Sequence, residues 1–362
     1  MPQISVLVVD DSVVIRRLVT DALQAEPDIR VVGTAPNGKV ALAKIEQLAP
    51  DVVTLDIEMP VMDGLTTIKE IRKTHAKLPV IMFSTLSVAG GAATLEALSS
   101  GASDYVTKPA NVGSVRESMA SVREQLVPRI RALCGRRAPS TRVPSRPVVT
   151  ATPSGPPQRV ELLAVGCSTG GPEALTTVLT RMPADLPVPV VVVQHMPPVF
   201  TRLFAERLDR ASRLRVTEAT DGTTLVPGHV YIAPGDHHLE VVRTGTVTRT
   251  RLHDGPPECF CRPAVDVLFR SVASAYRGSA LGVVLTGMGQ DGKRGSELLR
   301  EHGSRVIVQD EATSVVWGMP GAVAGAGLAD AVLPLDQIGS AVIERITAMR
   351  RPPQSAGAPA WR

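Results

Sequence analysis

Three apolar runs in the second half of the chain limit its fold most, because each is followed closely by one reactive side chain. The runs are Leu162–Gly166, Val188–Val193 and Ala280–Leu285, and the side chains that follow them are Ser168, His195 and Asp291. Short apolar runs bounded by turn residues are typical of strands buried in a parallel sheet. Chemistry in an open α/β sheet gathers at the carboxyl ends of the strands, so we expect these three side chains at one edge.

A serine, a histidine and an aspartate together are the residue types of a nucleophilic hydrolase. Ser168 lies in the glycine-rich segment Gly166–Pro172, which joins the first of these strands to a helix predicted over Pro172–Arg181. The exposed N–H groups and dipole at a helix N-terminus favour a developing oxyanion. A serine here is also a common helix N-cap, and for this segment alone that alternative stays open.

The neighbouring thiol of Cys167 is an alternative nucleophile. It lies one position nearer the strand, where small buried residues are usual, so a packing role is favoured.

A metal site is a second alternative, for which the candidate ligands are His237, His238, His253, Cys259 and Cys261. We expect the three histidines in loops, and the spacing of the two cysteines matches no standard zinc pattern.

A glycine fingerprint also surrounds Asp291. Gly287, Gly289 and Gly292 fit the G-x-G-x-x-G pattern of a dinucleotide site, and Asp310 follows the next apolar run at the place of a ribose-binding acid. Such a fingerprint normally opens a Rossmann unit, whereas this one comes late in its domain. Asp291 also supplies the acid that Ser168 and His195 otherwise lack, so the catalytic triad is favoured.

The first half of the chain alternates predicted strands and helices five times. The predicted strands are Ile4–Val9, Arg30–Gly33, Val52–Leu55, Val80–Phe83 and Asp104–Val106, with amphipathic helices such as Val13–Ala25 and Gly38–Leu48 between them. Five βα units with short loops predict a doubly wound parallel sheet.

Acidic residues follow two of these strands: Asp10 and Asp11 the first, and Asp56 the third. Three converging carboxylates would repel one another without a cation, so they imply a hard divalent metal such as Mg²⁺. Asp56 is the best candidate for a carboxylate that attacks a phosphoryl donor, with Lys108 stabilising the transferred charge. Helix capping is an alternative for Asp10 alone, but it does not explain the whole set.

A proline-, serine- and arginine-rich stretch over residues 136–157 has no helical or strand period and predicts an extended linker. We therefore divide the chain into a first domain over 1–127, a linker over 128–159, a second domain over 160–350 and a disordered tail over 351–362. Residues 134–159 hold five arginines, no acidic residue and no aromatic residue. This composition favours a solvated linker over a nucleic-acid-binding patch.

Composition agrees with a soluble cytoplasmic protein that does not insert into a membrane. The chain has 362 residues, of which 44% are hydrophobic, which is enough for the cores of two domains. Its four cysteines suggest reduced thiols, no apolar run approaches the ~20 residues of a membrane span, and the start lacks the features of a signal peptide. No helix-turn-helix with a basic recognition face is found, which argues against a nucleic-acid partner.

Residues 1 to about 127 resemble a two-component receiver, a (βα)5 domain. The resemblance implies that Asp56 is the phosphoacceptor and that Mg²⁺ is held by Asp10, Asp11, Asp56 and the backbone carbonyl of Glu58. It further implies that Ser84 and Lys108 sense the phosphoryl group, and that Tyr105 is the aromatic switch.

The second half resembles the chemotaxis protein-glutamate methylesterase (CheB) family, a Rossmann-like doubly wound α/β fold. Five segments carry the resemblance: Gly166–Pro172, Gln194–Pro197, Arg262–Phe269, Leu285–Gly292 and Val316–Pro320. The order of receiver, linker and esterase is also that of the family. Cys167 departs from the family pattern, where alanine is usual, and Cys259 and Cys261 fall in a variable loop.

The resemblance implies hydrolysis of glutamate γ-methyl esters on methyl-accepting chemotaxis receptors, with release of methanol, and deamidation of specific receptor glutamines. Ser168 would attack the carbonyl, His195 would carry the proton, and Asp291 would orient the imidazole. The expected oxyanion donors are the backbone N–H groups of Thr169 and Met288. The ester chemistry is expected to need no metal, and the receiver is expected to take its phosphoryl group from a histidine kinase.

Overall fold

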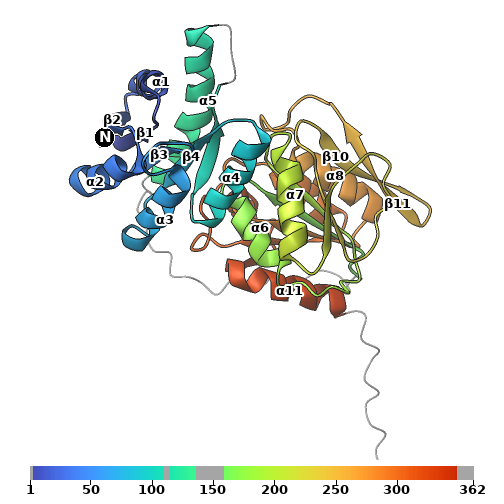
Figure 1. Cartoon of the computed structure of the whole chain (residues 1–362). Coiled ribbons are helices and arrows are strands. Elements are labelled where there is room, and N and C mark those ends of the chain that lie inside the picture. Colours follow the sequence, from blue (N-terminus) through green and yellow to red (C-terminus); the bar gives the residue numbers. More distant parts are fainter. Residues whose placement is uncertain (1–2, 110–113, 136–158, 349–362) are drawn as a thin grey trace, which may run out of the picture. The chain divides into compact units, whose positions relative to one another are not determined.

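The computed structural model describes residues 3–109, 114–135 and 159–348, which divide into an N-terminal and a C-terminal unit (Figure 1). Most of the predicted linker, and all of the predicted tail, lie outside the described residues. Residues 128–134 belong to helix α5 (Val115–Cys134), so the helix continues past the boundary expected at residue 127. A proline usually ends a helix, but Pro128 lies inside this one. The last turns are held by Arg131, which pairs with Glu26 and Asp28.

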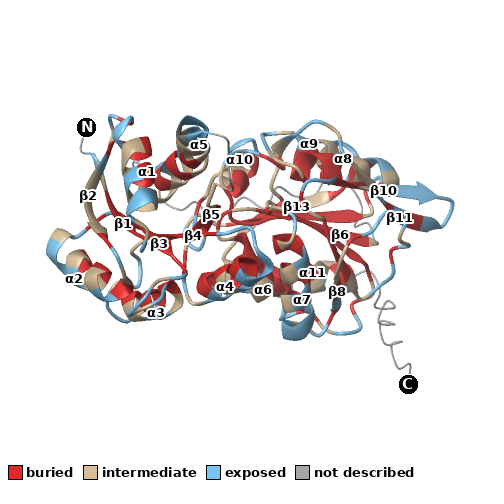
Figure 2. Ribbon diagram, turned by 45° about the horizontal axis from the view of Figure 1, so that its top comes forward, coloured by how far each residue is buried: buried red, intermediate tan, exposed pale blue. Residues whose placement is uncertain are grey.

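The N-terminal unit is a five-stranded sheet with helices on both faces, as predicted. Its strands are all parallel, in the order β2-β1-β3-β4-β5. They are β1 (Ile4–Val9), β2 (Ile29–Ala35), β3 (Val52–Asp56), β4 (Val80–Ser84) and β5 (Asp104–Thr107). Helices α1 (Val13–Gln24) and α5 cover one face, and α2 (Gly38–Leu48), α3 (Gly64–Thr74) and α4 (Val88–Ser99) cover the other (Figure 2).

The C-terminal unit contains a seven-stranded parallel sheet in the order β14-β13-β12-β6-β7-β9-β8. The strands are β6 (Leu162–Cys167), β7 (Val190–Gln194), β8 (Arg215–Glu218), β9 (His229–Ile232), β12 (Ala280–Val284), β13 (Arg305–Gln309) and β14 (Ala331–Leu333). One face carries α6 (Gly171–Leu179), α7 (Phe200–Ala211) and α11 (Leu335–Thr347). The other carries α8 (Val265–Tyr276), α9 (Lys293–Glu301) and α10 (Met319–Gly325), so the doubly wound fold class is confirmed (Figure 2).

The strand order of the C-terminal sheet reverses between β6 and β12. The chain runs from β6 outward to β7, then returns to the other side of β6 to build β12 and β13. Crevices open at such reversals beyond the carboxyl ends of the strands, and ligands bind there. Ser168 follows β6 and Asp291 follows β12, while His195 follows β7 beside β6. The topology therefore brings the three predicted residues to one edge.

A separate antiparallel hairpin, β10 (His238–Thr244) and β11 (Val247–His253), packs against α8. The prediction that His238 and His253 lie in loops was wrong, because these two residues are paired across the hairpin. His238 is buried, accepts a hydrogen bond from Ala264 N–H and contacts the carbonyl of Pro256. His237 lies just before β10, outside the strands.

Strand β6 and helix α8 pack closely at Gly166, so a larger residue there should destabilise the fold. A Cβ atom on Gly166 would lie 2.4 Å from Cγ1 and 2.7 Å from Cγ2 of Val265. We expect Gly166→Ala to lower the free energy of unfolding by about 1–3 kcal/mol, the usual effect of overpacking a core. Thermal unfolding measured by calorimetry checks this.

Gly325→Ala is the matched control, because a Cβ on this helical glycine meets no atom within 4 Å. It should leave the unfolding midpoint unchanged or slightly raised. Equal midpoints for wild type and Gly166→Ala would show that α8 moves away at no cost.

Candidate active site

Ser168 is held where the loop after β6 meets the loop after β12. Its N–H donates to the carbonyl of Thr286 over 3.0 Å. The backbone of Gly287 packs on the serine so closely that a Cβ there would lie 2.9 Å from Cβ of Ser168. Only glycine permits this approach, which fixes the serine against the strand that leads to Asp291.

Gln194, which the sequence did not single out as a site residue, joins the loops after β6 and β7. Its side-chain amide donates to the carbonyls of Ser168 (3.1 Å) and His195 (3.2 Å), and the side chain is buried. The N–H of His195 donates to the carbonyl of Cys167 over 3.2 Å. These bonds fix the backbone of the serine and the histidine relative to each other.

The imidazole of His195 makes the pairing that a catalytic triad requires with its acid. Nε2 lies 2.8 Å from Oδ2 of Asp291. On the other side of the ring, Nδ1 lies 3.4 Å from Sγ of Cys261. Within the residues that the structure describes, no hydrogen bond joins the Ser168 hydroxyl to His195. The predicted residues therefore gather at one edge, with the histidine–aspartate pair formed and a thiol beside the second ring nitrogen.

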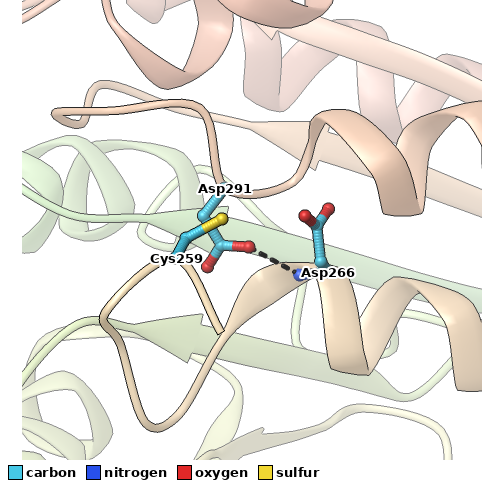
Figure 3. Close-up of side chains that lie close together, drawn as sticks. All are labelled: Cys259, Asp266 and Asp291. Carbon is cyan, nitrogen blue, oxygen red and sulfur yellow. Dashed lines mark hydrogen bonds between the residues drawn. The ribbon is translucent and has the colours of Figure 1, made fainter. Parts of the chain in front are cut away.

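Asp291 is held by the N-terminus of helix α8. Its carboxylate accepts hydrogen bonds from the N–H groups of Val265 (2.6 Å), Asp266 (2.8 Å) and Gly292 (2.9 Å). Figure 3 shows the bond between Asp291 and the Asp266 nitrogen. The first turn of α8 has no side-chain cap at Ala264, so Asp291 satisfies its free N–H groups.

The charges of the pair follow from these contacts. Burial alone would raise the pKa of Asp291, but the hydrogen bond and charge of His195 and the backbone N–H groups bring it below its usual value. Burial alone would lower the pKa of His195, but the contacts with Asp291 and Cys261 outweigh it and raise this pKa to about 10. The contacts of the ring therefore favour its protonated form, and burial of the ring favours the neutral form that a general base requires.

Cys259, Asp266 and Asp291 lie close together, with one ligand atom from each within 4.8 Å of the others (Figure 3). Both oxygens of Asp291 already accept two hydrogen bonds each, and Asp266 accepts one from Gly295 N–H over 2.7 Å. Burial, together with the charge of Asp291, raises the pKa of Asp266 to about 6. The cluster is thus better explained by helix capping than by metal binding.

The alternative metal site built from cysteines and histidines does not form. Cys259 lies beside Asp291 and Cys261 beside His195. The three histidines are engaged elsewhere: His237 with Asp254, His238 with backbone, and His253 with Gly255 N–H.

Cys167, the alternative nucleophile, is buried at the end of β6 with Sγ 3.8 Å from the carbonyl of Val193. Burial raises the pKa of its thiol, which favours a packing role.

The glycine fingerprint is occupied by the protein itself. Met319 N–H donates to the carbonyl of Gly287, and a Cβ on Gly318 would lie 2.7 Å from the same oxygen and 2.8 Å from Gly289 nitrogen. The backbone of Gly287 is therefore covered by the protein and cannot receive a pyrophosphate. Asp310 accepts hydrogen bonds from the N–H and hydroxyl of Thr313, so it caps its own turn. These contacts disfavour the dinucleotide alternative.

A second site lies at the strand reversal of the N-terminal sheet, between β1 and β3. Nζ of Lys108 lies 2.9 Å from Oδ2 of Asp10 and 2.8 Å from Oδ2 of Asp56. Carboxylate oxygens of Asp10, Asp11 and Asp56 lie within 4.8 Å of one another. Asp11, Asp56 and Lys108 border a cavity of about 220 Å³, which is also lined by Glu58 and Ser84.

The donor set of this second site fits a hard divalent cation, because it consists of carboxylate oxygens. Burial raises the pKa of Asp56 to about 6; Lys108 opposes that rise and the charge of Asp10 adds to it. A bound cation would favour the ionised carboxylate. The hydroxyl of Ser84 donates to the carbonyl of Gly90 over 3.2 Å, and Tyr105 lies on β5.

Among the described residues, no helix combines the length and apolar character needed to cross a membrane.

Comparisons with known proteins cover both units. Residues 6–120 match the response regulator receiver domain family, and residues 163–342 match the CheB methylesterase family. A Nocardioides protein named protein-glutamate methylesterase/protein-glutamine glutaminase is 57% identical, over 99% of this chain and 100% of the relative. A protein of the same name from Trichodesmium erythraeum is 50% identical, over 96% of this chain and 100% of the relative. The solved catalytic domain of Thermotoga maritima CheB methylesterase is 43% identical, with a TM-score of 0.50, covering 51% of this chain and 98% of that domain.

The electrostatics of the His195–Asp291 pair generate a prediction. Asp291→Asn removes the negative charge that stabilises the imidazolium, so we expect the pKa of His195 to fall by at least ~1 unit, which corresponds to about 1.4 kcal/mol. A histidine titration followed by NMR measures this directly.

Asp254→Asn is the matched control, because Asp254 pairs with the half-exposed His237 at the surface. Exposed ion pairs are weak, and Asp254 does not contact His195, so this substitution should leave the pKa of His195 near that of wild type. An unchanged His195 pKa in Asp291→Asn would show that the carboxylate does not stabilise the imidazolium.

Proposed function

The chain belongs to the CheB methylesterase family, and on that premise we propose that it hydrolyses glutamate γ-methyl esters of chemotaxis receptors and deamidates specific receptor glutamines. Its receiver domain places this activity under the control of phosphorylation. We assign the receiver to residues 1–127 with the remainder of α5, and the esterase to residues 160–350. The observation that supports the proposal best is the His195–Asp291 pair, which is held by α8 beside the strand that leads to Ser168.

In the proposed reaction the hydroxyl oxygen of Ser168 attacks the γ-carbonyl carbon, and its proton passes to His195. Nε2 of the imidazole is engaged by Asp291, so Nδ1 is the nitrogen that takes the proton. The protonated imidazole then returns the proton to the leaving group, which departs as methanol from an ester or as ammonia from an amide. Water, activated by the neutral imidazole, hydrolyses the acyl-enzyme and regenerates the serine.

The oxyanion donors we propose are the backbone N–H groups of Thr169 and Met288. The N–H of Ser168 itself is already bound to the carbonyl of Thr286, so it is not available. Met288 follows Gly287, whose backbone packs against Ser168, and Thr169 follows the serine towards α6. We propose that the ester step uses no metal, because the oxygens of Asp291 are fully engaged by hydrogen bonds.

The receiver accepts a phosphoryl group from a histidine kinase on Asp56. Mg²⁺ would be held by Asp10, Asp11, Asp56 and the Glu58 carbonyl, where it supplies positive charge to the transferring phosphoryl group. Lys108 already contacts Asp56 and is placed to bind a phosphoryl oxygen there. The substrates are cytoplasmic domains of receptors, so the proposed place of action is the cytoplasm.

The nucleophile is tested by three substitutions in the esterase. Ser168→Ala, His195→Ala and Asp291→Asn should each lower the rate of receptor ester hydrolysis by at least about 10³-fold, and the losses should be far from additive because the three act as one unit. Methanol release from methylated receptor measures the rate.

His237→Ala, a histidine paired at the surface, is the control and should keep wild-type activity. Full activity in Ser168→Ala would end the proposed mechanism. If Cys167→Ser were inactive at the same time, the thiol would be the nucleophile.

Phosphorylation of Asp56 is expected to relieve inhibition by the receiver. The phosphoryl group brings charge and acceptor oxygens that draw the Ser84 hydroxyl away from Gly90 and let Tyr105 repack. A small phosphodonor with Mg²⁺ should therefore raise methanol release by the intact chain, and Asp56→Ala should abolish the response.

The control is Asp21→Asn, on the exposed side of α1, which should respond to the phosphodonor as wild type does.

Inhibition by the receiver is tested with a fragment of residues 150–350, which should release methanol faster than the unphosphorylated whole chain. If it is no faster, inhibition by the receiver is wrong.

A further inference from the structure

A thiol occupies the side of the catalytic imidazole that faces away from Asp291. Sγ of Cys261 lies 3.4 Å from Nδ1 of His195, while Nε2 lies 2.8 Å from Asp291. Nδ1 is the nitrogen that the proposed mechanism requires for the Ser168 proton. The imidazole of His195 is therefore contacted by the Asp291 carboxylate at Nε2 and by the Cys261 sulfur at Nδ1. The serine hydroxyl must displace this sulfur to reach Nδ1.

Cys261 is the last residue of a tight turn that begins at Glu258. The N–H of Cys261 donates to the carbonyl of Glu258 over 2.8 Å, and the reverse bond measures 3.1 Å. The two central residues, Cys259 and Phe260, have φ values of 51° and 63°. Positive φ at two successive residues with side chains is costly, and the fully exposed Phe260 gains no packing in return. Contacts of its end residues, Glu258 and Cys261, must therefore stabilise this turn.

Helix α8 holds the first end of this turn. Both oxygens of the Glu258 carboxylate pair with the guanidinium of Arg270 on α8, at 2.8 and 2.5 Å. The N-terminus of the same helix binds Asp291. Helix α8 thus fixes Asp291 on one side of the imidazole and the turn that carries Cys261 on the other. The contact between the thiol and Nδ1 therefore depends on the same helix as the contact between Asp291 and Nε2.

We propose that Cys261 is a positioning residue of the esterase. Its sulfur holds the imidazole of His195 through Nδ1 in the resting enzyme and yields that nitrogen to the Ser168 hydroxyl during turnover, a role that rests on the function proposed above. Cys261 forms no bond to substrate in this scheme.

The proposal predicts how the imidazole titrates. Two groups face its ring nitrogens: Asp291, from the loop before α9, and Cys261, from the turn before α8. Cys259 and Asp266 lie against Asp291. Both partners of the ring favour its protonated form, against the effect of burial. Removing the sulfur should therefore let His195 become neutral at a lower pH.

The test is Cys261→Ser and Cys261→Ala in the full chain. We expect the pKa of His195, followed by NMR titration, to fall by at least ~1 unit in both variants, which is a tenfold larger ratio of neutral to charged imidazole at neutral pH. The pH profile of kcat/KM for ester hydrolysis should shift to lower pH by the same amount. Cys259→Ser, in the same turn but beside Asp291, is the matched control and should leave the His195 pKa near that of wild type.

An unchanged His195 pKa in both Cys261 variants would overturn the proposal. So would a loss of ester hydrolysis in Cys261→Ser as large as that in Ser168→Ala, because Cys261 would then take part in the chemistry. The titration needs no esterase activity, so it stays informative even if Ser168→Ala remains active and the proposed function fails. Backbone amide spectra establish folding, and Cys261→Ser carries the test if the alanine variant does not fold.

Discussion

The carboxylate of Asp291 at the N-terminus of α8 is the interaction on which the catalytic unit depends. A buried carboxylate is costly unless hydrogen bonds and an opposite charge compensate for its lost hydration. Three N–H groups and the imidazole do so here. The benefit is mutual, because α8 begins at Val265 with no side-chain cap and would otherwise leave N–H groups unsatisfied. The ionised acid and the start of the helix therefore stabilise each other, and His195 takes its position from both.

Each unit builds its chemistry at the point where its strand order reverses. In the first sheet the reversal lies between β1 and β3, which carry Asp10 and Asp56 at their ends; in the second it lies between β6 and β12, which lead to Ser168 and Asp291. The two sites use charge differently. Carboxylates gathered around Lys108 leave room for a cation, whereas Asp291 has its charge fully compensated by protein groups. The same architecture thus supports phosphoryl transfer in one unit and acyl transfer in the other.

The sequence predicts the strands whose apolar runs are continuous and whose ends carry reactive residues, because burial on both faces leaves an unambiguous pattern. It does not predict the β10–β11 hairpin, because buried and exposed residues do not alternate along β10 and the buried positions of β11 are threonines. Nor does it predict the roles of Gln194, Asp266 and Cys261, because each depends on contacts between segments far apart in the sequence that no local pattern records. The sequence also gives no sign that helix α5 continues past residue 127, because the ion pairs of Arg131 with Glu26 and Asp28 that hold its last turns are tertiary.

The two sides of the imidazole differ in how far they can be adjusted. On the Nε2 side, Asp291 has no unused oxygen position, so any change there costs a hydrogen bond to α8 or to His195. On the Nδ1 side, the only group that meets the ring in the described part of the chain is a thiol, a weak hydrogen-bonding partner carried by a strained turn. A weak partner can be displaced by a serine hydroxyl without disturbing the aspartate. The fold therefore keeps Asp291 fixed and leaves the Nδ1 side of His195 free to exchange partners.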